Sequence, residues 1–137
     1  MSDTLFLESR IEIIVRSTEI DVNGHVNNAK YLEYFEWGRE DYYESAQLPY
    51  EVLLQLGYIT VTANINVNYR KEAKQNDRLT IITRPGRMGN TSFTLEQTII
   101  DESKDLLVAD ASVTLVMVDA MTRKAVSVPR ELREWFQ

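Results

Sequence analysis

Hydrophobic and polar residues alternate most regularly over residues 58–70. A period of two predicts a β-strand with one apolar and one polar face. Because the polar face carries a full row of Thr and Asn, we expect it to be half solvated or to line a polar cleft or interface. The apolar row consists of Val61, Ala63, Ile65, Val67 and Tyr69.

Four further segments have the apolar alternation of strands, separated by polar or Gly- and Pro-containing turns. The predicted strands are residues 9–16, 78–84, 91–101 and 106–118. Residues 85–90, with two Gly and one Pro, predict the loop of a hairpin. The predicted polar turns are residues 71–77, 102–104 and 119–124, and residues 125–128 are expected to pair briefly.

A helical period replaces the alternation after residue 27. Apolar residues recur with helical spacing from Tyr31 to Tyr42, while Glu33 and other acids fall on another face, which we expect to meet water. Asn27 or Asn28 is a suitable N-cap, and the helix is predicted to end near residues 45–46.

Two shorter helices are predicted, at residues 47–56, closed by Gly57, and at residues 129–135, with Pro129 first. One long helix between a first strand and a run of antiparallel strands predicts an α+β fold whose sheet wraps or covers the aromatic helix.

Composition limits the class of protein. The 137 residues predict one domain, and 44% hydrophobic with 26% charged residues are typical of a soluble globular chain. No apolar run reaches the length of a membrane span, and no signal-peptide pattern is present, so we expect no membrane partner. The net charge of -6 argues against nucleic-acid binding. The absence of Cys fits a cytoplasmic enzyme.

The turn before the long helix carries the candidate chemistry. Asp21 lies seven positions before Asn28, with Gly24 between them to relax the backbone. A helix N-terminus offers unpaired N–H donors and a partial positive charge. A carbonyl bound there would have its oxygen polarised while the Asp21 carboxylate approaches its carbon or activates a water. That arrangement suits hydrolysis of an activated acyl group, although a turn Asp also has an ordinary structural role.

Residues 21–39 resemble the Asp-x-x-Gly-His-Val-Asn-Asn-x-x-Tyr signature of hotdog-fold thioesterases, in particular the 4-hydroxybenzoyl-CoA thioesterase-like family. The order of elements is similar over nearly the whole chain. The resemblance implies a hotdog fold, a curled antiparallel sheet around a long central helix, and hydrolysis of acyl-CoA without a cofactor. It also implies a site that spans two subunits, so a homodimer or homotetramer is expected.

The resemblance also assigns residues. The loop Asp of the family, catalytic as nucleophile or general base, corresponds to Asp21, and the carbonyl-polarising backbone N–H corresponds to that of Asn28. The other residues that we predict to contact substrate, including basic residues that would meet the phosphates of coenzyme A, are Gly24, His25, Tyr31, Arg70, Lys71 and Arg87.

Other chemistries have less support. His25, the single histidine, has no thiol or obviously paired Ser, which disfavours a nucleophilic triad, and no metal-ligand cluster is present. Two alternatives stay open: hydrolysis of acyl groups on acyl carrier protein, which the same signature also resembles, and a hotdog protein that binds acyl-CoA without turnover. A hotdog dehydratase is less favoured, because that branch uses a catalytic His in a different setting.

Overall fold

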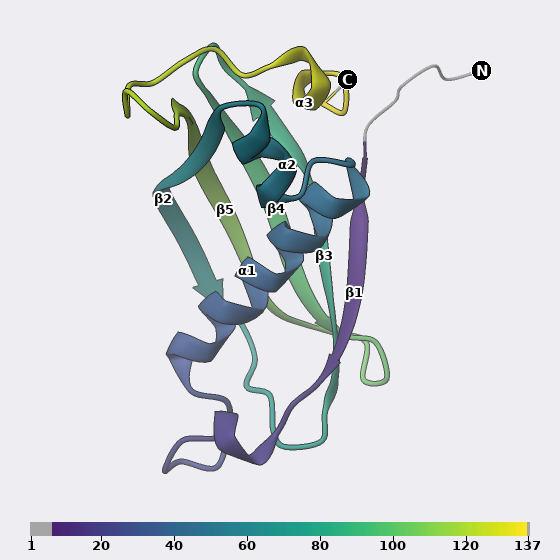
Figure 1. Cartoon of the computed structure of the whole chain (residues 1–137). Coiled ribbons are helices and arrows are strands. Elements are labelled where there is room, and N and C mark those ends of the chain that lie inside the picture. The colour runs from purple at the N-terminus through teal and green to yellow at the C-terminus, as the bar shows by residue number, and fades with distance from the viewer. Residues whose placement is uncertain (1–6, 137) are drawn as a thin grey trace, which may run out of the picture.

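In the part of the chain that the structure describes, five antiparallel strands form one sheet across which a long helix runs (Figure 1). The computed structural model describes residues 7–136. The strands lie in the order β1-β3-β4-β5-β2, so β1 and β2 are the edges. Their bounds are β1 (Ser9–Ile14), β2 (Tyr58–Tyr69), β3 (Arg78–Met88), β4 (Ser92–Asp101) and β5 (Leu106–Asp119).

The helices lie on one face of this sheet and at its two ends. They are the short 3-10 helix η1 (Ser17–Glu19), α1 (Asn28–Ser45), α2 (Tyr50–Gln55) and α3 (Arg130–Arg133). Figure 1 shows α1 crossing the sheet diagonally, α2 beside β2, and α3 at the end remote from the start of α1. The predicted α+β fold, a curled antiparallel sheet around a long helix, is confirmed. None of the helices in the described part of the chain combines the length and hydrophobicity needed to cross a bilayer.

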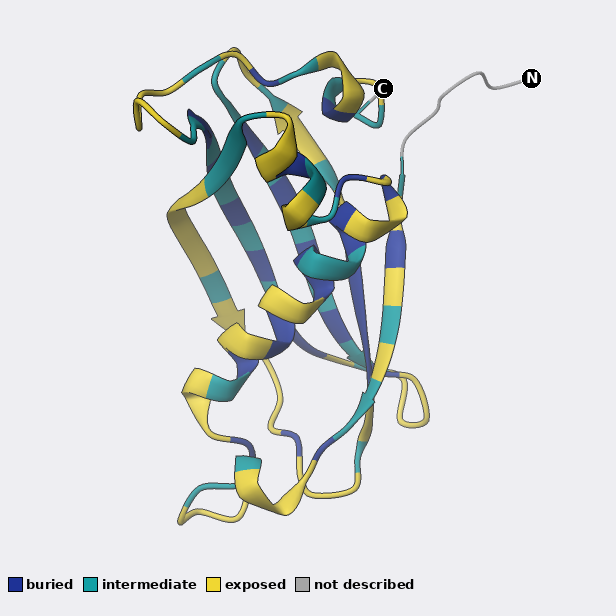
Figure 2. Ribbon diagram, viewed as in Figure 1, coloured by how far each residue is buried: buried dark blue, intermediate teal, exposed yellow. Residues whose placement is uncertain are grey.

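The helical period of the sequence places the core face of α1 correctly. Tyr31, Tyr34, Phe35 and Tyr42 are all buried against the sheet, as Figure 2 shows for the inner side of the helix. Trp37 departs from this pattern, since it lies on the β1 flank of α1 and is 38% exposed. Asn27 is the N-cap, with its side-chain oxygen accepting from the Ala29 N–H at 2.8 Å.

At Gly38, α1 lies too close to the sheet to accommodate a side chain. A Cβ at this position would lie 2.7 Å from Cγ2 of Ile81. It would also lie 2.9 Å from both Nε2 of Gln97 and Oγ1 of Thr83. The close backbone packing expected for a helical Gly is therefore present, and the contacted atoms belong to buried side chains.

Replacing Gly38 by Ala is expected to lower the free energy of unfolding by about 1–2 kcal/mol. Overpacking of about 2–3 kcal/mol exceeds the helix-propensity gain of about 1 kcal/mol. Urea denaturation measures the difference, with Ser45→Ala on the exposed end of α1 as a control expected to be neutral or slightly stabilising. A Gly38→Ala protein as stable as the wild type would contradict this packing.

The apolar row predicted for β2 is wrong at its first half. The pairing of β2 with β5 shifts between Thr62 and Asn64, so Ala63 is an extra residue in a β-bulge. Because the side-chain period is two, the bulge reverses the faces on either side of it. Val61 therefore faces away from α1, whereas Ile65, Val67 and Tyr69 share the helix side of the sheet with buried residues of β5.

The predicted hairpin loop at residues 85–90 is also wrong. Residues 85–88 continue β3, and the connection to β4 is only residues 89–91. A register shift between Pro85 and Met88 accommodates the proline. Gly86 is required because a Cβ would collide with Thr94, whose hydroxyl accepts from the Arg87 N–H.

The remaining boundaries differ by a few residues. The second helix begins only at Tyr50, because Gln47 has φ +63°, which ends the helical backbone, and Pro49 is the N-cap. Pro129 likewise caps α3 rather than starting it. The brief pairing predicted for residues 125–128 is a single bridge between Val118 and Ala125.

Candidate active site

The loop before α1 is a closed, tightly hydrogen-bonded turn. Ile20 and Val26 form an isolated antiparallel bridge. Within the turn, the Asp21 N–H donates to the His25 carbonyl at 2.9 Å, and the Gly24 N–H donates to the Asp21 carbonyl at 3.1 Å. Gly24 has φ +85°, and the space around it is open, so backbone conformation explains this glycine. The turn thereby fixes Asp21 close to the start of α1.

The Asp21 carboxylate is partly committed to the turn. Its Oδ1 accepts from the Asn23 N–H at 2.9 Å, which is the local capping bond expected of a turn Asp. Within residues 7–136, Oδ2 has no hydrogen-bond partner. The side chain is half-buried. One oxygen is thus held in place while the other is available for chemistry.

The first turn of α1 leaves one suitably placed donor. The Asn27 cap takes the N–H groups of Ala29 and Lys30, at 2.8 Å and 2.9 Å. No described residue accepts a hydrogen bond from the Asn28 N–H, which is the first of the helix. This donor lies at the positive end of an 18-residue helix. It is therefore equipped to polarise a carbonyl oxygen.

A cavity of about 210 Å³ opens beside this helix start. It brings together most of the residues predicted to contact substrate, and Asp21 and Gly24 lie on the adjoining turn rather than in its lining. Arg87 is not brought to it, because it lies near the end of β3 by Met88, at the opposite end of the sheet from the start of α1. The predicted residues in the lining are His25, Asn28, Tyr31, Arg70 and Lys71.

Besides Val26 of the signature, two residues of the lining were not among the predicted substrate contacts. Tyr69 packs its ring against Tyr31 with centroids 5.5 Å apart, and its hydroxyl donates to the Asn28 carbonyl at 3.4 Å. Glu72 lies 3.6 Å from Nε2 of His25. Both are adjacent in sequence to the predicted Arg70–Lys71 pair. That adjacency is the feature of the sequence that could have predicted them as site residues.

The charges around the cavity are unevenly neutralised. Arg70 pairs with Asp110 at 2.8 Å, and together with a hydrogen bond from Asn68 this holds the pKa of Asp110 below its usual value. Lys71, by contrast, has no carboxylate of the described residues within ion-pairing distance. Lys71 is therefore the cation most available to an anionic ligand.

A comparison with known families identifies the chain. The model of the thioesterase-like superfamily matches residues 15–136. The chain belongs to the thioesterase-like superfamily.

Relatives of this thioesterase-like protein agree with that assignment. The chain is 39% identical over 123 residues to the long-chain acyl-CoA thioesterase FadM of Escherichia coli, a match that covers 90% of this chain and 92% of FadM. It is 27% identical to the acyl-CoA thioesterase YbgC of Haemophilus influenzae, over 86% of each chain. The crystal structure of YbaW, a probable thioesterase from Escherichia coli, superposes with a TM-score of 0.80 at 34% identity, covering 93% and 98%.

In this thioesterase-like protein, a buried tyrosine ties the segment before the turn to α1. The Tyr34 hydroxyl donates to Oε1 of Glu19 at 2.8 Å. Burial, and then this hydrogen bond, raise the pKa of Tyr34 well above its usual value. The Glu19 carbonyl in turn accepts from the Asn27 N–H at 2.9 Å. The sequence offered no signal for this pair, which holds the turn in register with the helix.

Proposed function

We propose that the protein hydrolyses acyl-CoA thioesters at the start of α1. The Asn28 N–H would bind the thioester oxygen, and the Asp21 carboxylate would attack the carbonyl carbon or deprotonate the water that does. The observation that carries this proposal is the pairing of an unsatisfied helix N-terminal amide with a half-free carboxylate on one closed turn. Family membership and the named activities of FadM and YbgC support thioester hydrolysis.

The chemistry requires no cofactor. Attack converts the carbonyl to a tetrahedral oxyanion, whose charge the Asn28 N–H and the helix dipole stabilise. Its collapse breaks the C–S bond and releases coenzyme A. If water is the nucleophile, the free acid forms directly. If Asp21 is the nucleophile, water then hydrolyses the resulting anhydride. Both routes give one acid and one thiol per water consumed.

The basic residues at the end of β2 are proposed to meet the phosphates of coenzyme A. Lys71 is the best placed, because Arg70 is already engaged by Asp110. Arg87 would contact the same substrate only from another copy of the chain, since its own strand end lies away from the cavity. These local cations would offset the net charge of -6.

Initial rates on a panel of acyl-CoAs and the matching acyl carrier protein thioesters test this function. The proposal expects turnover of acyl-CoAs at least as efficient as turnover of the carrier protein esters. A strong preference for the protein carrier would indicate an acyl carrier protein thioesterase instead. Saturable binding of acyl-CoA without turnover would indicate a binding protein rather than an enzyme.

We also propose that two copies pair through β2. This edge strand has 12 residues, and Figure 2 shows it mostly exposed. Its apolar residues include Val61 and Tyr69, which are 45% and 50% exposed. A long edge with exposed apolar side chains is a liability for a monomer and suits strand pairing. Such pairing would bring a second subunit beside the cavity at Tyr69.

Replacing Val61 by Lys is expected to shift the protein from dimer, or tetramer, toward monomer, because a charge on a buried edge is costly. Size-exclusion chromatography with light scattering measures the mass at matched concentrations. Met121→Lys, at an exposed apolar residue outside β2, is the control. A monomeric wild type, or a Val61→Lys variant that keeps the wild-type mass, would contradict the pairing.

The cytoplasmic location stays a prediction.

A further inference from the structure

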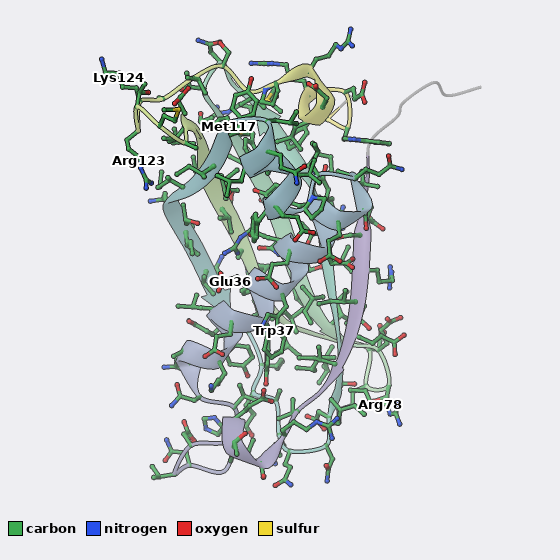
Figure 3. The ribbon with its side chains drawn as sticks, in the orientation of Figure 1. Glu36, Trp37, Arg78, Met117, Arg123 and Lys124 are labelled. Carbon is green, nitrogen blue, oxygen red and sulfur yellow. The ribbon has the colours of Figure 1, made fainter. Side chains whose placement is uncertain are left out.

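A second cavity, of about 340 Å³, lies at the other end of the helix side of β2. It is bounded by α1, α2 and the first half of β2 (Figure 1). The bulge at Ala63 contributes directly, because it turns Thr60 and Thr62 toward the helix side. Leu53, Leu54 and Leu115 supply apolar walls. Figure 3 shows Glu36 on the flank of α1 toward β2, and Trp37 on the other flank.

The most unusual member of the lining is Arg39. The residue is only 6% exposed, yet its side chain makes one hydrogen bond to the described residues, from Nη1 to Oε1 of Gln97 at 3.1 Å. The orientation of the Gln97 amide is fixed, because its Nε2 donates to the Phe35 carbonyl and to Oγ1 of Thr83. A buried charge is normally matched by an opposite charge. Here a neutral amide holds the guanidinium, and no described carboxylate lies within ion-pairing distance.

The neighbouring acids do not fill this role. Glu36 lines the same cavity but is exposed, and it does not pair with Arg39. The Tyr50 hydroxyl senses the same excess of positive charge. Burial raises its pKa, whereas the Arg39 charge lowers it, and by more than either Glu40 or Glu36 raises it. The cavity thus contains a cation with unused donors.

A strip of partly exposed side chains lies between this cavity and the one at the start of α1. Asn28, Leu32, Glu36 and Arg39 share one face of the helix. α1 packs over β1, β3 and β4, which leaves Ile65 37% exposed on the uncovered helix side of β2. From Asn28 to Arg39 the helix rises about 16 Å, at about 1.5 Å for each of the residues between them. A long acyl chain lying along this strip would end at Arg39.

We propose that the cavity at Arg39 binds the far end of the acyl group and favours acyl chains that end in a carboxylate. The guanidinium would form the charge-assisted hydrogen bonds that the protein itself leaves unmade. Thr60 and Thr62 would solvate the same group, and the leucines would cover the last methylenes. This inference rests on the proposed function for the position of the thioester end.

Binding of two esters matched in length tests the inference. Tetradecanoyl-CoA and the mono-CoA ester of tetradecanedioic acid are titrated calorimetrically into the Asp21→Asn protein, in which turnover does not interfere. The carboxylate ester is expected to bind more tightly. Adding Arg39→Gln is expected to reduce that preference by at least about tenfold, the value of one charge-assisted hydrogen bond. Adding Arg130→Gln, the same charge change on exposed α3, is expected to leave it unchanged.

Equal or tighter binding of the plain ester, or a preference that survives Arg39→Gln, would overturn the inference. If Arg39→Gln fails to fold, Thr62→Val provides the second variant, with a smaller loss of the same preference expected and an unchanged preference counting against the inference. Hydrolysis of either ester by the wild type is read separately. Tighter binding of the carboxylate ester without hydrolysis of either ester would contradict only the proposed function. Hydrolysis without that binding preference would contradict only this inference.

Discussion

Replacing Asp21 by Asn is expected to lower kcat for acyl-CoA hydrolysis by at least about 100-fold, the usual range for loss of a positioned base. An amide oxygen still accepts from the Asn23 N–H, so the turn keeps its geometry. What disappears is the negative charge that attacks the carbonyl or takes a proton from water. The thermal midpoint of unfolding should stay close to that of the wild type.

Asp105→Asn is the matched control, because Asp105 is exposed in the turn between β4 and β5 and its positive φ suits Asn. This variant should retain the wild-type kcat. An Asp21→Asn protein with unimpaired kcat would show that Asp21 takes no part in catalysis and has only the structural role of a turn residue.

Replacing Asn28 by Pro is expected to lower kcat by about 100- to 1000-fold, the cost of one lost oxyanion donor. Proline deletes the N–H while fitting the first position of a helix, where that group has no helical partner. The preceding Asn27 has φ -62° and ψ 139°, which a following proline accepts. The substitution therefore removes the proposed donor with little change of fold, which circular dichroism can verify.

Asn28→Ala separates the backbone from the side chain. It keeps the N–H and removes only the carboxamide, so we expect a change in kcat of less than about tenfold, far below the cost of losing the donor itself. If Pro and Ala reduce kcat equally, the side chain rather than the amide carries the effect. If neither changes kcat, the thioester oxygen binds elsewhere.

The sequence predicted the central helix and its start well, for local reasons. The spacing of the buried aromatics follows the helical period, and the capping by Asn27 depends on its own side chain. The family resemblance, the hotdog fold and the thioester hydrolase class that it implied are confirmed. The assignments of Asp21 and Asn28 stay predictions, because no ligand complex tests them.

Two errors came from features that alternation does not encode. The bulge at Ala63 adds one residue to β2, and a regular pattern of Thr, Asn and apolar residues gives no sign of it. Pro85 and Gly86 predicted a loop, yet β3 absorbs them, because Gly86 packs against a side chain of the neighbouring β4. Both outcomes depend on the partner strand rather than on local preference.

The parts of the site that the sequence missed come from distant segments. Tyr69 reaches Asn28 only because β2 ends beside the start of α1, and the contact of Tyr34 with Glu19 depends on how η1 folds back. Arg70 and Arg87 looked equivalent as basic residues near strand ends. The strand directions separate them, because β2 and β3 run in opposite directions and only β2 of the two ends beside the turn that precedes α1.

A crystal structure of the Asp21→Asn protein with tetradecanoyl-CoA tests the central claim most directly. The account predicts the thioester oxygen about 2.7–3.1 Å from the Asn28 nitrogen. It also predicts that the side chain at position 21 lies about 3–3.5 Å from the carbonyl carbon, or is joined to it by one water. A thioester bound with its carbonyl away from the start of α1, or with Asn28 and position 21 contacting only other parts of the ligand, would contradict it.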